Sequence, residues 1–530
     1  MENSRTRNSI YNFGSSLLVK VLQLCLSFAS RTVFIYVLGA AYLGLNGLFS
    51  NILSFLSLSE LGIGSAIAFL LYKPVASNDI HEIKIIMKFY KKCFHYIGFA
   101  IIGLGLCLLP FLNKMVNLNQ PIPENLYLVY VLFLMQSAIS YFFAGYKQAL
   151  LGANQKSYIL TKYNAFFSIA SVVLDIIVLL IFKNFIVYLS AKIGLAIVQN
   201  LVNAWKLDKV YPYLAEKVEE NLSHEQIKGI FKNVYSVFVF RLGSLLFNSV
   251  TNIVTSIVVG TIVVGYYSNY TMVVSQLEGL FMMAIGAIAA GVGNVMVVET
   301  KQRQYQIYKK LNLLTFFIYA MFSVCCVQLL NSFIHLWLGK IGSEYTLSQF
   351  IVILIVANMY TNCSCQVLEK FRTASGNFQI GRELQVIGGF TNIFLSVILA
   401  KCWGFEGVLI SPFLCKIFIT VTPFVVRIGK TVFCRTYKQM LWEYYSQMLF
   451  VTLVCLLTWF ACKSFHEGSI LDFIFEILIT FAITIISFVV VFHRKAEYKE
   501  LVTPILHKFK LTKKFKQDRN EHINNQSTSF

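Results

Sequence analysis

The sequence predicts an all-α polytopic membrane protein with about 14 transmembrane helices, arranged as two six-helix lobes and two extra C-terminal helices. Composition is the first observation. Of 530 residues, 57% are hydrophobic and 13% are charged, and the mean hydropathy is +0.66. Soluble domains of this size do not have such a composition, and the apolar runs are long enough to cross a bilayer repeatedly. The distribution of charge and an internal repeat are the other two observations.

The net charge of +20 is distributed unevenly over the loops. Most of the 45 Lys and Arg residues fall in alternate loops and in the two termini. The other set of loops contains Lys114, Lys183, Lys340, Lys401 and Lys463. This is the positive-inside pattern, so both termini are predicted to be cytoplasmic. The basic tail 493–530 is then expected to lie against anionic lipids and not to bind nucleic acid.

The first predicted lobe, residues 1–206, begins with a short basic segment and no signal-peptide cleavage site, so its first apolar run is expected to be a retained helix. Its helices are predicted at 10–38, 43–72, 93–112, 126–147, 163–182 and 185–206. The basic, amphipathic segment 73–92 between the second and third helices is expected to lie on the cytoplasmic surface.

A charged stretch, 207–232, is the longest polar interruption and is predicted to be a cytoplasmic linker between the lobes. The second lobe, 233–426, has predicted helices at 233–259, 266–297, 311–333, 350–369, 384–400 and 405–426. The segment 427–492 adds two further helices, predicted at 446–462 and 470–492, before the basic cytoplasmic tail.

An internal repeat relates the two lobes. A shift of 221 residues matches Gly39 with Gly260, Gly44 with Gly265, Lys20 with Arg241, and Arg31 with Asn252. A shift of 224 residues matches Gly152 with Gly376, Gln155 with Gln379, and Lys192 with Lys416. Both halves start from the cytoplasm, so we interpret them as a parallel repeat related by an axis along the membrane normal. The last two helices have no counterpart.

Ionisable residues inside the predicted helices are the candidate functional residues. Lys20 and Arg31 are separated by about 20° around one helix axis, on a stripe with Gln23 and Ser27. Such stripes on otherwise apolar helices face a protein interior or a water-filled cavity. The full set is Lys20, Arg31, Glu60, Asp175, Lys192, Arg241, Glu278 and Lys416. For each residue a structural salt bridge, or a long side chain reaching the interface, is the alternative interpretation.

Cations outnumber acids in this set, which favours an anionic ligand. Lys20, Arg31, Arg241, Lys192 and Lys416 are therefore candidates for binding a pyrophosphate group, because Arg and Lys suit phosphate in charge and donor geometry. Glu60, Asp175 and Glu278 are candidates for a proton or sodium site, or for gating salt bridges. The 12 cysteines have no zinc-site spacing, and no catalytic set, metal site or bound cofactor is expected.

Three stretches resemble one family. They are the opening hairpin from NSIYNFGSSLL to LSELGIGSAI, the segment AGYKQALLGANQ at 144–155, and FIHLWLG at 333–339. The chain resembles bacterial polysaccharide-export flippases, the Wzx-type O-antigen, capsule and exopolysaccharide transporters of the MATE-like MOP exporter superfamily. The resemblance implies a central cavity that alternates between the two sides of the cytoplasmic membrane. It also implies an undecaprenyl-pyrophosphate-linked oligosaccharide as substrate, with polysaccharide polymerase and glycosyltransferase machinery as partners.

Other functions stay open at this point. A peptidoglycan lipid-precursor flippase would share the same lipid anchor. A multidrug or cation antiporter would be expected to have an acidic cavity, whereas cations predominate here. A membrane polymerase is the alternative from a different class, an enzyme. It would be expected to need a sizeable outer loop, and the predicted outer loops are short.

Overall fold

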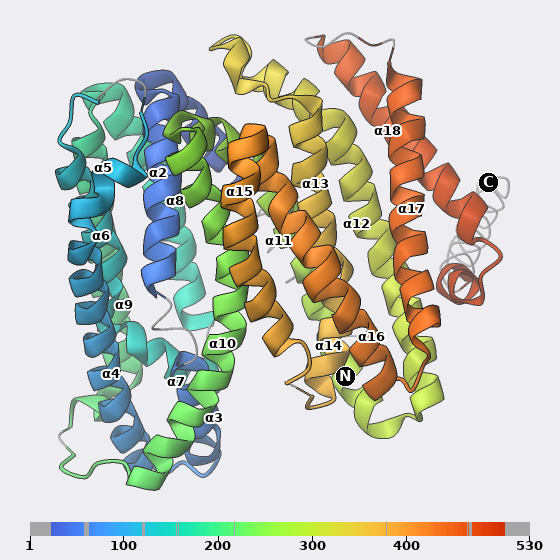
Figure 1. Cartoon of the computed structure of the whole chain (residues 1–530). Coiled ribbons are helices and arrows are strands. Elements are labelled where there is room, and N and C mark those ends of the chain that lie inside the picture. Colours follow the sequence, from blue (N-terminus) through green and yellow to red (C-terminus); the bar gives the residue numbers. More distant parts are fainter. Residues whose placement is uncertain are drawn as a thin grey trace, which may run out of the picture. The chain divides into compact units, whose positions relative to one another are not determined.

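The computed structural model describes residues 23–57, 63–118, 122–154, 156, 158–216, 218–377, 379–463, 465 and 469–503. Within these ranges the regular structure is helical throughout, and no strand occurs in them. The predicted all-α polytopic class is therefore confirmed (Figure 1).

The first part of the chain forms a series of long helices joined by short ones. The α-helices are Gln23–Leu38, α2 (Ala40–Leu56), α3 (Ile63–Ala76), α4 (Ile80–Cys107), α5 (Leu112–Met115), α6 (Leu126–Phe142), α7 (Gln148–Ala153), α8 (Tyr158–Phe182) and α9 (Phe185–Val210). The short 3₁₀ helices are η2 (Leu109–Phe111), η3 (Ala144–Lys147) and η4 (Pro212–Ala215).

The second part begins at a Ser223–Gln226 capping box, which fixes the start of α10 at His224. Its α-helices are α10 (His224–Val254), α11 (Thr261–Val298), α12 (Lys301–Leu338), α13 (Gln349–Ser364), α14 (Gln366–Ala374), α15 (Arg382–Cys415), α16 (Thr422–Thr431), α17 (Tyr437–Cys462) and α18 (Ile470–Phe492). The short elements are two π-helices, η5 (Thr255–Val259) and η7 (Lys416–Val421), and a 3₁₀ helix, η6 (Ser343–Tyr345).

Many of these helices are long and apolar enough to cross a membrane. Among the described residues eight pass that test, and a ninth is added if α6 and the bent segment after it count as one span. The stretch 382–431 contains two of the predicted helices, because α15 is kinked at Trp403 and Gly404. The chain is therefore a multi-pass membrane protein, while the total of about 14 spans stays a prediction.

Most of the segment 73–92 is the beginning of α4 and not a loop before it, while its place on the cytoplasmic surface stays a prediction. That helix starts at Ile80, where the Asp79 side chain accepts a hydrogen bond from the Glu82 N–H at 3.0 Å. Such a cap stabilises the first turn. Ile83 and Met87 are buried at helical spacing, so the basic residues occupy only the other face of a helix that continues into the membrane.

The segment between α9 and α10 lies within the predicted linker and is held against α4. It runs from the end of α9 to Ser223. Lys88 of α4 donates hydrogen bonds to the backbone carbonyls of residues 218–220 at 2.7, 3.1 and 3.2 Å. The Lys84 ammonium forms a 2.8 Å ion pair with Glu216. The segment between the repeats is thus fixed to the first repeat by a cation that satisfies three carbonyl groups.

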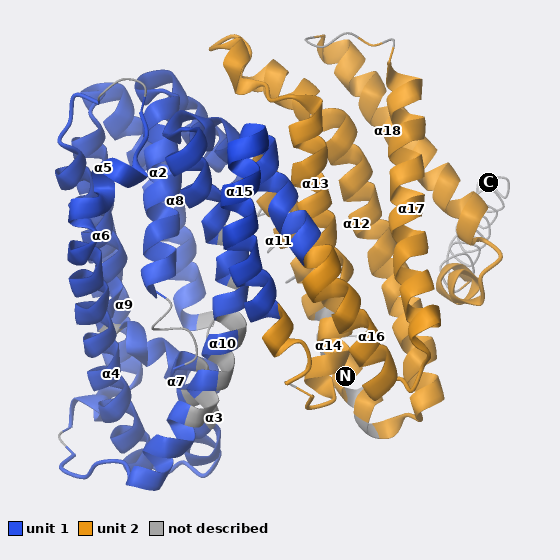
Figure 2. Cartoon of the chain, in the orientation of Figure 1, with its two compact units in different colours: residues 1–269, 385–415 blue, residues 270–384, 416–530 orange. Residues whose placement is uncertain are grey.

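The chain divides into two compact units (Figure 2). Unit 1 contains Met1–Asn269 and Gln385–Cys415, and unit 2 contains Tyr270–Leu384 and Lys416–Phe530. Unit 1 therefore includes α10 and the first turns of α11, which belong to the second repeat in sequence. The predicted lobes are defined by the sequence repeat, and their boundaries stay a prediction.

Glycines matched by the 221-residue shift pack against each other's helices within unit 1. Gly39 and Gly260 both have positive φ, +84° and +142°, and each directly precedes a helix. A Cβ atom on Gly44 would lie 1.9 Å from the carbonyl oxygen of Thr261. A Cβ atom on Gly265 would lie 2.3 Å from the carbonyl oxygen of Ala40. Because Ala40 and Thr261 are also matched by the shift, the contact is reciprocal, as two-fold symmetry requires.

Gly44→Ala is expected to destabilise the protein by about 1–3 kcal/mol, because the new methyl group meets backbone that cannot move aside. Thermal unfolding of the detergent-solubilised protein measures the change. Gly103→Ala is the matched control, because nothing lies within 4 Å of a Cβ at this exposed helical position. Equal melting temperatures for the two variants would contradict the contact.

Candidate functional site

Arg31 connects the first hairpin to the second. It is half-buried on the helix Gln23–Leu38. Its Nε donates a hydrogen bond to Asn269 Oδ1 at 3.0 Å, and its Nη2 donates to Ser268 Oγ. Both partners are on α11 and belong to unit 1. The guanidinium is therefore held in a fixed orientation by α11, which is the counterpart of α2 in the second repeat.

The repeat explains why the charge at this position is asymmetric. The counterpart of Arg31 is Asn252, and the counterparts of its partners Ser268 and Asn269 are Gly47 and Leu48. Neither of these two side chains can accept a hydrogen bond. The Oδ1 atom of Asn252 is buried without a hydrogen-bond partner in the described part of the chain. The two hairpins therefore provide hydrogen-bond acceptors for a cation at Arg31 but not at the matched position, Asn252.

Lys192 and Asp175 form a buried ion pair between α9 and α8. The Lys192 ammonium lies 3.5 Å from Asp175 Oδ2 and donates a 3.0 Å hydrogen bond to Tyr188 Oη. Asp175 is only 6% exposed, and its Oδ1 has no hydrogen-bond partner among the described residues. The structure thus joins Lys192 to Asp175 and Tyr188 and gives Lys192 a counter-charge.

Polar side chains on α8 and α9 face each other. Asn164 Oδ1 accepts hydrogen bonds from Gln199 at 3.2 Å and from Asn203 at 3.3 Å. These two helices pack along their length, so the two stripes form a shared polar seam inside unit 1. Within the seam these amides supply hydrogen-bond partners to one another, which a bilayer interior favours.

A cavity of about 670 Å³ opens beside this ion pair within unit 1. Residues from α2, α6, α9 and α10 line it. The polar lining residues are Asn46, Ser50, Ser54, Ser57, Gln136, Ser137 and Lys192, and the apolar ones are Leu53, Phe133, Leu189 and Leu245. This volume is typical of sites that bind small organic groups, about 300–1,000 Å³. Hydroxyl and amide groups dominate its polar surface.

Unit 2 contains a separate polar cluster built on Asn362 of α13. Its Nδ2 donates to Glu278 Oε1 at 3.1 Å, and its Oδ1 accepts a hydrogen bond from Lys416 Nζ at 2.7 Å. Lys416 and Glu278 are thus bridged by an amide. The cluster brings together one predicted phosphate-binding cation and one predicted coupling acid.

Three predicted site residues cannot be placed in this way. Lys20 and Glu60 lie outside the described residues. Arg241 belongs to α10, but its side chain is not described. Their proposed roles in phosphate binding and coupling stay predictions.

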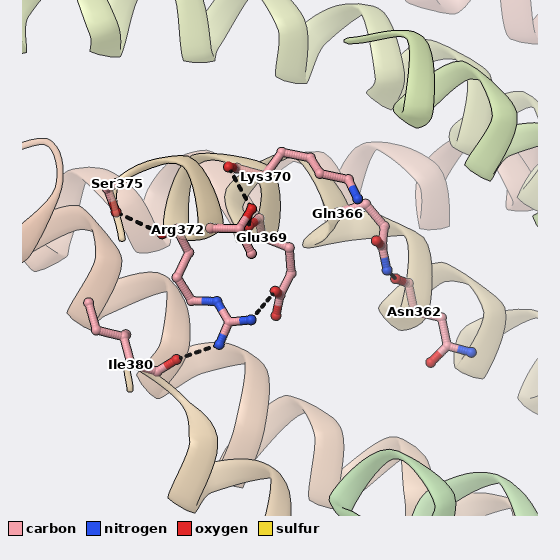
Figure 3. Close-up of polar contacts among 8 residues, drawn as sticks. Asn362, Gln366, Glu369, Lys370, Arg372, Ser375 and Ile380 are labelled. Atoms are coloured by element: carbon pink, nitrogen blue, oxygen red, sulfur yellow. Dashed lines mark hydrogen bonds and ion pairs between the residues drawn. The ribbon is translucent and has the colours of Figure 1, made fainter. Parts of the chain in front are cut away.

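Two further ion pairs involve buried cations that the sequence pattern does not identify. Lys147, 8% exposed, pairs with Asp208. Arg372, 4% exposed, pairs with Glu369 at 2.7 Å and also donates to the carbonyl of Ile380 at 3.0 Å (Figure 3). Lys147 is the last residue of η3, directly before α7, and Arg372 lies in the last turn of α14. The 224-residue shift matches position 148 with Arg372, so Lys147 lies one residue away from the counterpart of Arg372. This near match is the signal in the sequence that could have identified both cations.

The comparisons with known proteins show the fold. No family model and no curated protein matches the chain. Among solved structures, the chain is similar to "Lipid II flippase MurJ, inward closed conformation", with a TM-score of 0.67 and 14% identity over 92% of this chain and 99% of that one. It is also similar to an inward-facing "multidrug resistance MATE family transporter of the MOP superfamily", with a TM-score of 0.57 and 13% identity over 78% and 98%.

The chain therefore shares its fold with a lipid II flippase and with a multidrug transporter of the MOP superfamily. The predicted MATE-like fold is confirmed. The Wzx-type resemblance and the substrate that it implies are not tested by this likeness, because identities this low carry the fold alone.

Asp175→Ala is expected to destabilise the protein by about 3 kcal/mol, because it leaves the Lys192 ammonium without its counter-charge. The double variant Asp175→Ala with Lys192→Met should recover part of this loss, since it also removes the uncompensated cation. Thermal unfolding in detergent measures both. A double variant that is less stable than Asp175→Ala would show that the two side chains do not act as a pair.

Proposed function

We propose that the chain is a flippase that moves undecaprenyl-pyrophosphate-linked oligosaccharide repeat units across the bacterial cytoplasmic membrane for surface polysaccharide biosynthesis. The supporting observation is the combination found in unit 1. A cavity lined by hydroxyl and amide groups lies beside the Lys192–Tyr188 pair, and Ser268 and Asn269 hold Arg31 within the same unit. Sugar hydroxyls match the first kind of surface, and phosphate matches a guanidinium.

In this proposal the pyrophosphate binds Arg31 together with Lys20 and Arg241. Ser268 and Asn269 hold the Arg31 guanidinium through only part of its N–H donors, so the group is oriented before substrate arrives. Lys192 and Lys416 contribute less, because Asp175 and the Glu278–Asn362 pair offset their charges. The sugar part is released on the outer side while the lipid tail stays in the bilayer, by alternating access of the cavity.

Coupling and partners belong to the same proposal. Glu60, Asp175 and Glu278 are assigned to proton or sodium coupling, or to gating through salt bridges. Asp175 fits such a role through its buried Oδ1 atom. Membrane lipids surround the chain, both termini are cytoplasmic, and polymerase or glycosyltransferase machinery supplies and consumes the substrate.

A peptidoglycan lipid-precursor flippase is the second candidate, favoured by the likeness to the lipid II flippase structure. Its lipid anchor is the same, so only the sugar part distinguishes it. A cation antiporter is disfavoured because no acidic side chain lines the cavity within the described residues. A membrane polymerase is disfavoured because the fold neighbours are transporters and flippases.

Deletion of the gene, followed by analysis of lipid-linked intermediates, tests the function. A flippase predicts loss of surface polysaccharide with intact intermediates accumulating on the cytoplasmic side. Accumulation on the outer side would indicate a polymerase instead. Loss of cell-wall precursor export with normal surface polysaccharide would indicate the peptidoglycan alternative.

Arg31→Ala should lower export of lipid-linked sugar by roughly 10- to 150-fold, because one charged hydrogen-bonding partner of phosphate is worth about 1.5–3 kcal/mol. Arg241→Ala is expected to act in the same direction. Surface polysaccharide is measured per amount of protein in the membrane fraction. Lys401→Ala, an exposed cation, is the control and should export normally. Normal polysaccharide in the Arg31 variant would overturn the phosphate role.

A further inference from the structure

We propose that the unit 1 cavity binds the uncharged sugar residues of the substrate and that its phosphate groups bind outside this cavity. The inference rests on the proposed function and assigns one part of the substrate to one surface. It also separates Lys192, which lines the cavity, from the residues that bind phosphate.

The first argument is charge. Lys192 is the one ionisable residue on the cavity wall among the described residues, and Asp175 lies 3.5 Å from its ammonium. The described part of the wall is therefore close to electroneutral. A pyrophosphate entering it would lose water without gaining a compensating charge, which is costly in a low-dielectric site. An uncharged sugar meets no such penalty.

The second argument is the pattern of donors and acceptors. Asn46, Ser50, Ser54 and Ser57 follow one face of α2 and its C-terminal end, with Gln136 and Ser137 on α6. Ser54 and Ser57 donate their hydroxyl hydrogens to the carbonyls of Ser50 and Leu53, so their oxygens face the cavity as acceptors.

The amide groups complement these acceptors. The side chains of Asn46 and Gln136 have no hydrogen-bond partner within the described part of the chain. Each amide offers both a donor and an acceptor to a ligand. Neutral hydroxyl and acetamido groups need such a mixture, whereas a phosphate accepts hydrogen bonds only.

The third argument is the apolar part of the wall. Phe133 and Leu189 are buried residues that contribute carbon surface between the polar groups. Sugar rings carry C–H faces as well as hydroxyl groups, so a wall that alternates apolar and neutral polar groups complements them. The lipid tail, which is apolar throughout, would leave the amides and hydroxyls unsatisfied.

The test measures binding of two probes to the full-length protein in lipid nanodiscs. One probe is a polyprenyl pyrophosphate that carries N-acetylglucosamine, and the other is the same polyprenyl pyrophosphate without the sugar. Ser50→Leu and Gln136→Leu should each weaken binding of the sugar-bearing probe about tenfold and leave binding of the bare probe unchanged. Ser140→Leu, an exposed α6 position outside the cavity, is the matched control and should change neither affinity.

The other outcomes separate the two proposals. If Ser50→Leu and Gln136→Leu weaken both probes equally, the cavity holds the phosphate part and this inference is overturned while the flippase proposal stands. Equal affinity of the unaltered protein for the two probes would also overturn the inference. If neither probe binds the unaltered protein, the proposed function fails and the inference fails with it.

Discussion

The close approach of two helix backbones at Gly44 and Gly265 is the constraint on which the rest of unit 1 depends. Each glycine lies against a carbonyl group of the other hairpin, and the two contacts are related by the same sequence shift. Small residues are needed there because a Cβ would occupy the position of the carbonyl oxygen. This contact places α11 beside the first hairpin, where Ser268 and Asn269 can accept hydrogen bonds from Arg31.

Charge inside a membrane protein imposes the second constraint. Each described cation of the candidate set has a polar partner. Arg31 donates hydrogen bonds to residues of α11, Lys192 forms an ion pair with Asp175, and Lys416 donates a hydrogen bond to Asn362. Partners of opposite charge stabilise the fold but also offset the charge that a substrate would meet. Arg31 differs because its partners Ser268 and Asn269 are neutral, whereas Asp175 lies beside Lys192 and Asn362 bridges Lys416 to Glu278. It therefore keeps the positive charge that the proposed phosphate binding requires. The matched residue in the second repeat, Asn252, carries no charge.

Much of this fold could be predicted, because bilayer crossing and repeats leave long-range patterns in a sequence. The paired glycines and the asymmetric Arg31 were both identified in this way. The start of α4 was not, because basic residues at 73–92 obscured the apolar face that buries Ile83. The Lys192–Asp175 ion pair and the hydrogen bond from Arg31 to Ser268 could not be predicted either. Side-chain partners on different helices depend on axial register and rotation, which periodicity within one helix does not determine.

The central claim, translocation of a lipid-linked sugar, is tested most directly in liposomes that contain the purified protein and a fluorescent polyprenyl pyrophosphate bearing N-acetylglucosamine. A membrane-impermeant quencher reports how much of the labelled lipid reaches the outer leaflet. The account predicts that the inner-leaflet pool becomes accessible when the protein is present, and that Arg31→Ala slows this exchange. Fluorescence as well protected as in protein-free liposomes would contradict it.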